Sequence, residues 1–174
     1  MSDQRQQQLP RFAWHELLEP IAPPDPEPRE AAFLFAKGKR LHYKLEAIVG
    51  QFELTEHEGV YRDPDLPFEI SYHPDITRQE VGVDGSIKTY LYEIKSLLWF
   101  LKNRVYCAAQ ASGYAHFEGA ADVLFILYWR VRRDSPDEDN LSLSVLKLDR
   151  IPWPELKQLA KRAYAERGGG GFPT

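Results

Sequence analysis

Hydrophobic residues recur along the chain at two spacings, which predict helices and strands in a mixed order. In residues 29–50, apolar side chains recur every three, four or seven positions, which predicts a helix ending at Gly50. Residues 51–62, 67–81 and 86–95 are rich in branched and aromatic side chains and are separated by turn residues, which predicts strands. The first half of the chain is therefore expected to be a helix followed by a β-meander.

The second half returns to a helix and then alternates. The pattern over residues 96–120 predicts a helix, in which Gly113 lowers helix stability by a tolerable amount. The almost continuous apolar run over 121–133 predicts a buried strand. Residues 141–151 alternate as a strand does, and 152–168 form an amphipathic pattern between a proline and several glycines. The order α-β-β-β-α-β, followed by β and α, predicts a mixed sheet flanked by helices, in the α/β or α+β class.

The ends of the chain differ from its middle in composition. Residues 1–28 are polar and then proline-rich, which predicts a loose arm with one short helix around "WHELLE", and residues 168–174 predict a flexible glycine-rich tail. Residues 29–167 are expected to form a single domain. The start of the sequence has no basic-then-apolar pattern, and no apolar run approaches the roughly 20 residues that span a bilayer. We therefore expect a cytoplasmic protein.

Composition excludes some kinds of site. The 174 residues contain one cysteine, Cys107, so an intrachain disulfide and an all-cysteine zinc or iron–sulfur site are impossible. The formal net charge is −4. An acidic total allows nucleic-acid binding only if the basic residues gather on one face.

The strand over 86–95 carries two opposite charges, Glu93 and Lys95, on one face. Its register against the preceding strand depends on the turn. A two-residue Asp-Gly loop would point Asp75 and Glu93 to opposite faces, whereas a three-residue loop over 83–85 would place Asp75 directly opposite Glu93. With the longer loop, two acids and a lysine converge.

Two carboxylates facing each other across strands repel, unless a cation lies between them. Mg²⁺ prefers carboxylate oxygens together with water and phosphate, and a nearby lysine can stabilise charge on a phosphate or position the attacking water. The alternative is a surface ion-pair ladder of Glu93 with Lys95 or Lys88. Two helical pairs add candidate groups at a spacing of four residues: His42 with Glu46, and Gln110 with Tyr114.

The four motifs, in their order along the chain, resemble a known enzyme family. "GKRLHYKLE" on a helix, "HPDI" before a strand, "EIK" on the next strand and "QASGY" on the following helix are similar to the PD-(D/E)XK nucleases. They resemble in particular the RecB-like exonuclease branch, which includes CRISPR-associated exonucleases and the mitochondrial genome maintenance exonuclease. The resemblance covers roughly residues 35–130 and implies a restriction-endonuclease-like core.

By this resemblance, each candidate residue acquires an expected role. The metal, Mg²⁺ or Mn²⁺, would be held by side chains and one carbonyl, Lys95 would be the catalytic lysine, and two residues would contact the DNA backbone. Glu46 would support the ligands without binding the metal. The expected metal ligands are His42, Asp75, Glu93 and the carbonyl of Ile94, and the expected DNA contacts are Gln110 and Tyr114.

The sequence also departs from the family pattern. Tyr72 stands where the branch often has glycine, and the separation of Asp75 from Glu93 is somewhat long. Asp84, Asp63 and Asp65 therefore remain alternative ligands. The cysteines of the iron–sulfur relatives are missing, so no cluster is expected. The chain has no helicase motif, so an unwinding partner would be a separate protein.

The expected function is a divalent-metal-dependent DNA nuclease that acts as an exonuclease or on single strands and flaps. Its expected partners are DNA and a helicase, recombinase or other protein, with no membrane. One alternative is a catalytically silent subunit that binds nucleic acid or protein through exposed Trp99, Tyr106 and Trp129. Another is a restriction-type endonuclease with the same centre.

Overall fold

The computed structural model describes residues 8–24, 58–130 and 141–169. The helix expected over 29–50, and with it His42 and Glu46, lies outside these residues. None of the helices in the described part of the chain combines the length and the apolar character needed to cross a membrane.

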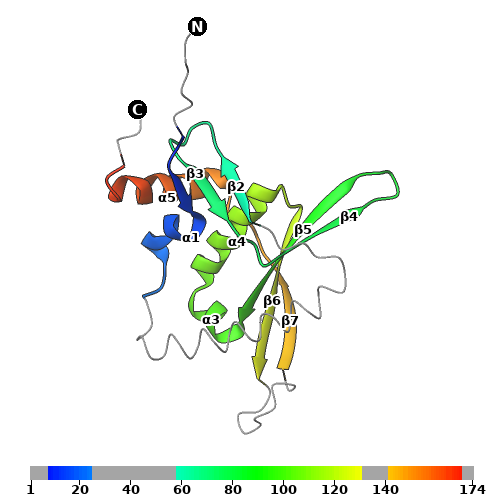
Figure 1. Ribbon diagram of the computed structural model, residues 1–174. Helices are drawn as coiled ribbons and strands as arrows, with labels where there is room; N and C mark the ends of the chain where they lie inside the picture. Colours follow the sequence, from blue (N-terminus) through cyan, green and yellow to red (C-terminus); the bar gives the residue numbers. More distant parts are fainter. Residues whose placement is uncertain (1–7, 25–57, 131–140, 170–174) are drawn as a thin grey trace.

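A four-stranded mixed sheet, here called the larger sheet, forms the centre of the molecule (Figure 1). Its strands are β4 (Ile76–Val81), β5 (Ile87–Ser96), β6 (Asp122–Arg130) and β7 (Leu141–Lys147), in that spatial order. The β5–β6 pair is parallel, and the other two pairs are antiparallel. The apolar run in β6 is explained by its central position, because both of its edges are paired and its inward side chains are buried.

A second, smaller sheet has three strands in the order β1-β3-β2. Strand β1 (Arg11–Ala13) pairs in parallel with β3 (Glu69–Tyr72), and β2 (Gly59–Arg62) pairs antiparallel with β3. The sequence pattern did not predict β1. A strand of three residues is too short to show a period of two.

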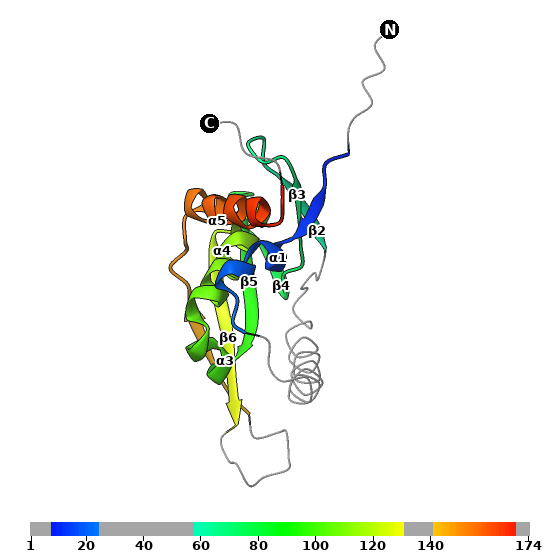
Figure 2. The same cartoon turned by 90° about the vertical axis from the view of Figure 1, so that its left-hand side faces the viewer.

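Helices pack against both sheets and against one another. Helices α3 (Leu97–Lys102) and α4 (Arg104–Glu118) lie along one face of the larger sheet (Figure 2). The short α1 (Trp14–Leu17) and η1 (Glu19–Ile21) pack against α5 (Trp153–Glu166), which also contacts α4. The expected fold class, a mixed α/β fold with helices flanking mixed sheets, is confirmed.

Two expected elements are each divided in the structure. The single strand predicted over 67–81 is wrong: it is two strands, β3 and β4, which belong to different sheets and are separated at Pro74. Proline cannot donate a ladder hydrogen bond, and it restricts the residue before it, so the chain leaves one sheet there and enters the other. Pro74 is fully buried at this crossing.

The single helix predicted over 96–120 is also wrong, because it breaks at Asn103. This residue has φ −127° and ψ 37°, outside the helical region. Its side-chain amide and its backbone amide both donate to the Trp99 carbonyl, each at 3.0 Å, which closes the last turn of α3. The break lets α3 and α4 follow different directions over the larger sheet.

The segment expected to be a loose arm supplies part of the core. Trp14, Leu17 and Leu18 are each at most 1% exposed. The Trp14 indole lies against Gly113 of α4 so closely that a Cβ added to this glycine would overlap the ring. Glycine at position 113 is therefore required for the close approach of the Trp14 indole to α4. From the sequence pattern alone, this glycine was expected only to reduce the stability of the helix by a tolerable amount.

Candidate active site

The turn between β4 and β5 decides which charged residues meet. The observed register pairs Val81 with Ile87, which leaves the three-residue loop over 83–85, and Gly85 has φ 79°. This is the longer of the two alternatives considered from the sequence. The same register, continued one step past the start of β4, brings Asp75 opposite Glu93.

Hydrogen bonds from backbone amides connect the carboxyl groups of Asp75 and Glu93. The Ile94 amide donates to Asp75 Oδ2 at 2.8 Å, and the Asp75 amide donates to Glu93 Oε1 at 3.3 Å. Lys95 Nζ lies 3.2 Å from Glu93 Oε2. The side chain of Glu93 is 1% exposed and that of Lys95 is 16% exposed. The surface-ladder interpretation is therefore wrong, since these charges are enclosed between the larger sheet and the helices.

The enclosure of Glu93 and Lys95 shifts the pKa values of both side chains. Burial, reinforced by the neighbouring Asp75 carboxyl and opposed by Lys95, raises the pKa of Glu93 to about 7. Burial alone would lower the pKa of Lys95, but Glu93 and Asp75 raise it above its ordinary value of 10.5. The lysine is thus an ammonium at neutral pH, and one cation does not fully offset two carboxylates.

Helix α4 brings an amide and a phenol to the same place. Gln110 Nε2 donates to the Tyr114 hydroxyl at 3.3 Å, and Tyr114 is 6% exposed. Burial is the largest cause of the raised pKa of Tyr114, and Glu93 and Lys95 act on it as charged neighbours. Among the described residues, the buried Oε1 of Gln110 has no hydrogen-bond partner. The helix thus presents an unused acceptor on the side chain that binds the Tyr114 hydroxyl.

Two tyrosines extend this cluster beyond what the motifs anticipated. Tyr72, the departure from the family pattern, packs its ring against Tyr114 with centroids 6.2 Å apart. Tyr106 lies one helical turn before Gln110, and Lys95 acts on its pKa. The sequence signal for Tyr106 was its spacing of four residues from Gln110 and eight from Tyr114, which places all three on one side of α4.

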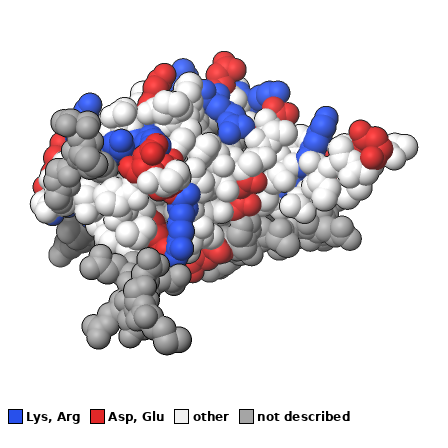
Figure 3. All heavy atoms as spheres, turned by 90° about the horizontal axis from the view of Figure 1, so that it is seen from above, with Lys and Arg blue, Asp and Glu red and all other residues white. Residues whose placement is uncertain are grey.

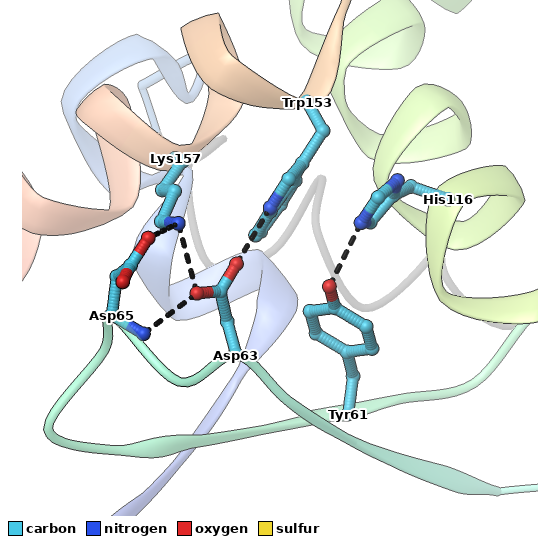
Figure 4. Close-up of polar contacts among 6 residues, drawn as sticks. All are labelled: Tyr61, Asp63, Asp65, His116, Trp153 and Lys157. Atoms are coloured by element: carbon cyan, nitrogen blue, oxygen red, sulfur yellow. Dashed lines mark hydrogen bonds and ion pairs between the residues drawn. The ribbon is translucent and has the colours of Figure 1, made fainter.

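The three alternative aspartates lie elsewhere. Asp84 accepts hydrogen bonds from the amide and hydroxyl of Ser86 in the hairpin turn, at 3.0 and 2.6 Å. Asp63 and Asp65 both bind Lys157, at the start of α5 (Figure 4). The structure brings only Asp75 of these four to Glu93.

Asp63 belongs to a buried polar cluster that attaches α5 to the smaller sheet. Its carboxylate accepts from Trp153 Nε1 and from Lys157 Nζ, each at 2.8 Å (Figure 4). The neighbouring Tyr61 hydroxyl lies 2.8 Å from His116 Nε2, and the His116 ring stacks on Trp153 with centroids 4.7 Å apart. This arrangement has a structural role, because each polar group is used to join elements.

The Asp63 contacts predict an acid-sensitive contribution to stability. Burial would raise the pKa of Asp63, but hydrogen bonds from Lys157, Trp153 and the Asp65 amide lower it below the ordinary 3.8. A pKa lower in the folded state gives stabilisation that is present above the unfolded value and lost as pH falls through the folded one. We expect Asp63→Ala to lower the free energy of unfolding by roughly 3 kcal/mol at neutral pH, and by less below pH about 4.

Urea unfolding at several pH values measures this effect. Asp65→Ala is the matched control, because Asp65 binds the same lysine with a side chain 67% exposed. We expect it to cost at most about 1 kcal/mol. Equal losses for the two variants, or a loss for Asp63→Ala that does not depend on pH, would contradict the assignment.

The donor set at the β4–β5 base fits a hard divalent cation. Asp75 and Glu93 offer carboxylate oxygens. Burial first and the Asp75 carboxyl second raise the pKa of Glu93, so a cation bound there would relieve both effects. Within the described ranges, no group of three His, Cys, Asp or Glu side chains is placed to hold a metal ion. The expected ligand His42 and its neighbour Glu46 lie outside those ranges.

On the face seen from above in Figure 3, acidic and basic side chains are interspersed. The segregated basic face that an acidic DNA-binding chain requires is therefore not found on this side.

Comparison with known proteins gives structural but not sequence relatives. No family model matches the sequence, and no curated protein matches it. The solved structure of SSO0001 is similar over 90% of this chain and 76% of its own, with a TM-score of 0.54 and 13% identity. An alkaline exonuclease, LHK-Exo from Laribacter hongkongensis, is similar over 91% of this chain and 88% of its own, with a TM-score of 0.49 and 15% identity.

A second structure of LHK-Exo, in complex with dAMP, has a TM-score of 0.45 and 14% identity over 89% of this chain and 86% of its own. At these identities the comparisons concern the path of the chain and not its chemistry. The similarity to SSO0001 places this protein's fold beside that structure.

Proposed function

We propose that this protein is a DNA nuclease that depends on Mg²⁺ or Mn²⁺ and acts as an exonuclease or on single strands and flaps. The observation that carries the proposal is the enclosed group of Asp75, Glu93 and Lys95 at the base of the β4–β5 hairpin. Burying two carboxyl groups against each other is costly, and a structural role would be met more cheaply by apolar residues. The motif order along the chain supports the same function.

Each residue of the site would have a role that follows from its chemistry. Asp75 and Glu93 would hold the cation together with the Ile94 carbonyl and His42. Bound there, Mg²⁺ or Mn²⁺ supplies charge neutralisation on the scissile phosphate and a lowered pKa for the attacking water. Lys95, held as an ammonium, would stabilise negative charge on the phosphate.

The α4 residues would position the substrate. Tyr114 has Glu93, Lys95 and Asp75 as charged neighbours, and the Gln110 side chain is already hydrogen-bonded to its hydroxyl. A fixed amide and phenol can contact a phosphate backbone without first losing rotamer freedom. Tyr72 would support Tyr114 from the opposite side through ring packing.

Digestion of end-labelled single-stranded DNA tests the proposal. We expect cleavage with Mg²⁺ or Mn²⁺, none with EDTA, and a loss on the order of 100-fold for Glu93→Gln. Glu80→Gln is the matched control: Glu80 is an exposed acid on β4 of the same hairpin, paired with Arg78 at 3.2 Å. Its variant should digest as fast as wild type.

A direct measurement of Mn²⁺ binding separates the nuclease from a silent binding subunit. Uptake of Mn²⁺ by the wild type, and its loss in Glu93→Gln, are expected. DNA binding that persists without any uptake of the ion would replace the nuclease proposal with the binding-subunit alternative. Digestion of linear but not circular single-stranded DNA is expected for an exonuclease, and nicking of the circle would indicate the endonuclease alternative.

A further inference from the structure

A cavity of about 420 Å³ lies between α1–η1 on one side and α3–α4 on the other. This volume falls within the range of small-molecule sites. Two aromatic side chains from the helices, Trp99 and Tyr106, line it together with the consecutive prolines Pro23 and Pro24. Flat aromatic and proline surfaces facing one space suit a flat, uncharged ligand.

Tyr106 lines the cavity and belongs to α4, the helix that also carries Gln110 and Tyr114. This residue begins the stripe on α4 that continues through Gln110 and Tyr114 at intervals of four residues. Burial raises the pKa of Tyr106, and the charge of the Lys95 ammonium opposes the increase, so the two side chains are electrostatic neighbours.

Trp99 is held in position before any ligand arrives. Its amide donates to Ser96 Oγ at 3.2 Å, and its carbonyl accepts from the amide of Asn103 at 3.0 Å. A side-chain hydrogen bond also links Trp99 with Cys107. The side chain is nevertheless 39% exposed. A ring that is fixed and accessible can stack on a ligand at little cost in conformational entropy.

Charges at the cavity disfavour a phosphate inside it. Glu16 and Glu19 line the cavity, and Arg167 pairs with both. With two carboxylates against one guanidinium, the local balance is negative. An anionic group would be repelled there, whereas a neutral base with amino or imino hydrogens would find acceptors.

We propose that this cavity is a subsite for one unpaired nucleobase of the DNA strand, which stacks on Trp99 and Tyr106 while the phosphate beside it lies toward Lys95. This inference rests on the proposed nuclease function and extends it from the reacting phosphate to the recognition of the strand. It also gives a reason for single-strand preference, because a base paired in a duplex is not free to enter.

Binding of a short labelled oligothymidylate in EDTA tests the subsite apart from cleavage. We expect Trp99→Leu and Tyr106→Leu each to raise the Kd on the order of 10-fold, the loss typical of one stacked base. Tyr90→Leu is the matched control, since Tyr90 on β5 is half-buried and is not among the described residues that line the cavity. Unchanged affinity in the first two variants, an equal loss in the control, or no binding by the wild type would overturn the proposal.

An abasic substitution makes the test specific to one nucleotide. When a single abasic site is moved along the oligonucleotide, one position should weaken binding to the wild type and have no effect on Trp99→Leu. Equal effects on both proteins would overturn the stacking assignment. A response of Trp99 fluorescence to a proline-rich peptide but not to the oligonucleotide would also overturn it, in favour of a peptide groove.

The outcomes distinguish this inference from the proposed function. Metal-dependent cleavage with unaltered DNA binding in Trp99→Leu would remove the subsite and leave the nuclease. Stacking-dependent binding without any cleavage would remove the nuclease and leave a base-binding cavity.

Discussion

Replacing Lys95 by alanine is expected to slow metal-dependent DNA cleavage by on the order of 100-fold or more. Lys95 is the cation that faces the Asp75–Glu93 pair in the described part of the chain, 3.2 Å from Glu93 Oε2. Because its pKa is raised by the two carboxyl groups, it remains an ammonium through neutral pH, and we expect it to act through its charge and not as a base. The loss should therefore be in kcat, measured by single-turnover digestion of labelled single-stranded DNA.

The controls come from the same strand and the same chemistry. Lys88→Ala removes an exposed lysine of β5 and should leave the rate unchanged. Lys95→Arg keeps the charge with a different shape, so partial recovery is expected. Thermal unfolding of each variant confirms that it is folded. If Lys95→Ala digests DNA as fast as wild type, Lys95 has no catalytic role.

Trp14→Ala is expected to lower the free energy of unfolding by about 3–5 kcal/mol, the usual cost of emptying a core aromatic site. Trp14 is 1% exposed and packs edge-on against Phe117, with ring centroids 5.3 Å apart. Its indole N–H donates to the Gln110 carbonyl at 3.2 Å, so the variant also removes a hydrogen bond that reaches α4. Urea denaturation followed by circular dichroism measures the loss.

The matched variant is Gly113→Ala. Its effect on the free energy of unfolding is expected to have opposite signs in the wild type and in the Trp14→Ala background. In the wild type, Gly113→Ala forces a methyl group into the Trp14 ring and should cost about 1–3 kcal/mol. In the Trp14→Ala background the ring is gone, and alanine should stabilise α4 by up to about 1 kcal/mol through helix propensity. A destabilisation of the same size in both backgrounds would show that Gly113 is not required by Trp14.

Local pattern and turn chemistry predicted the hairpin that carries the candidate site and limited its register to two alternatives. The glycine at position 85 made a three-residue loop possible, and that loop set the register of Asp75 against Glu93. The alternation of β5 then placed Glu93 and Lys95 on one side. These features depend on residues close together in sequence, whose geometry is largely fixed by steric rules.

The sequence pattern did not determine where long elements end. The prediction over 67–81 passed through Pro74, and that over 96–120 passed through Asn103, because the hydrophobic periodicity continues on both sides of each break. What decided the breaks was the packing of each half against a different partner. Strand β3 joins the smaller sheet and β4 the larger one, and α3 and α4 cover different parts of β5 and β6.

By itself, the sequence predicted most of the alternation of helices and strands, two alternative hairpin registers and a set of candidate polar residues that includes Asp75, Glu93 and Lys95. Only the tertiary structure decided that Asp63, Asp65 and Asp84 are used elsewhere, that Glu93 and Lys95 are enclosed, and that Trp99 and Tyr106 share one cavity. Trp14 illustrates the reason: its hydrogen-bond partner is 96 residues away. Spacing along the chain encodes local geometry, whereas burial and electrostatics depend on which distant surfaces finally meet.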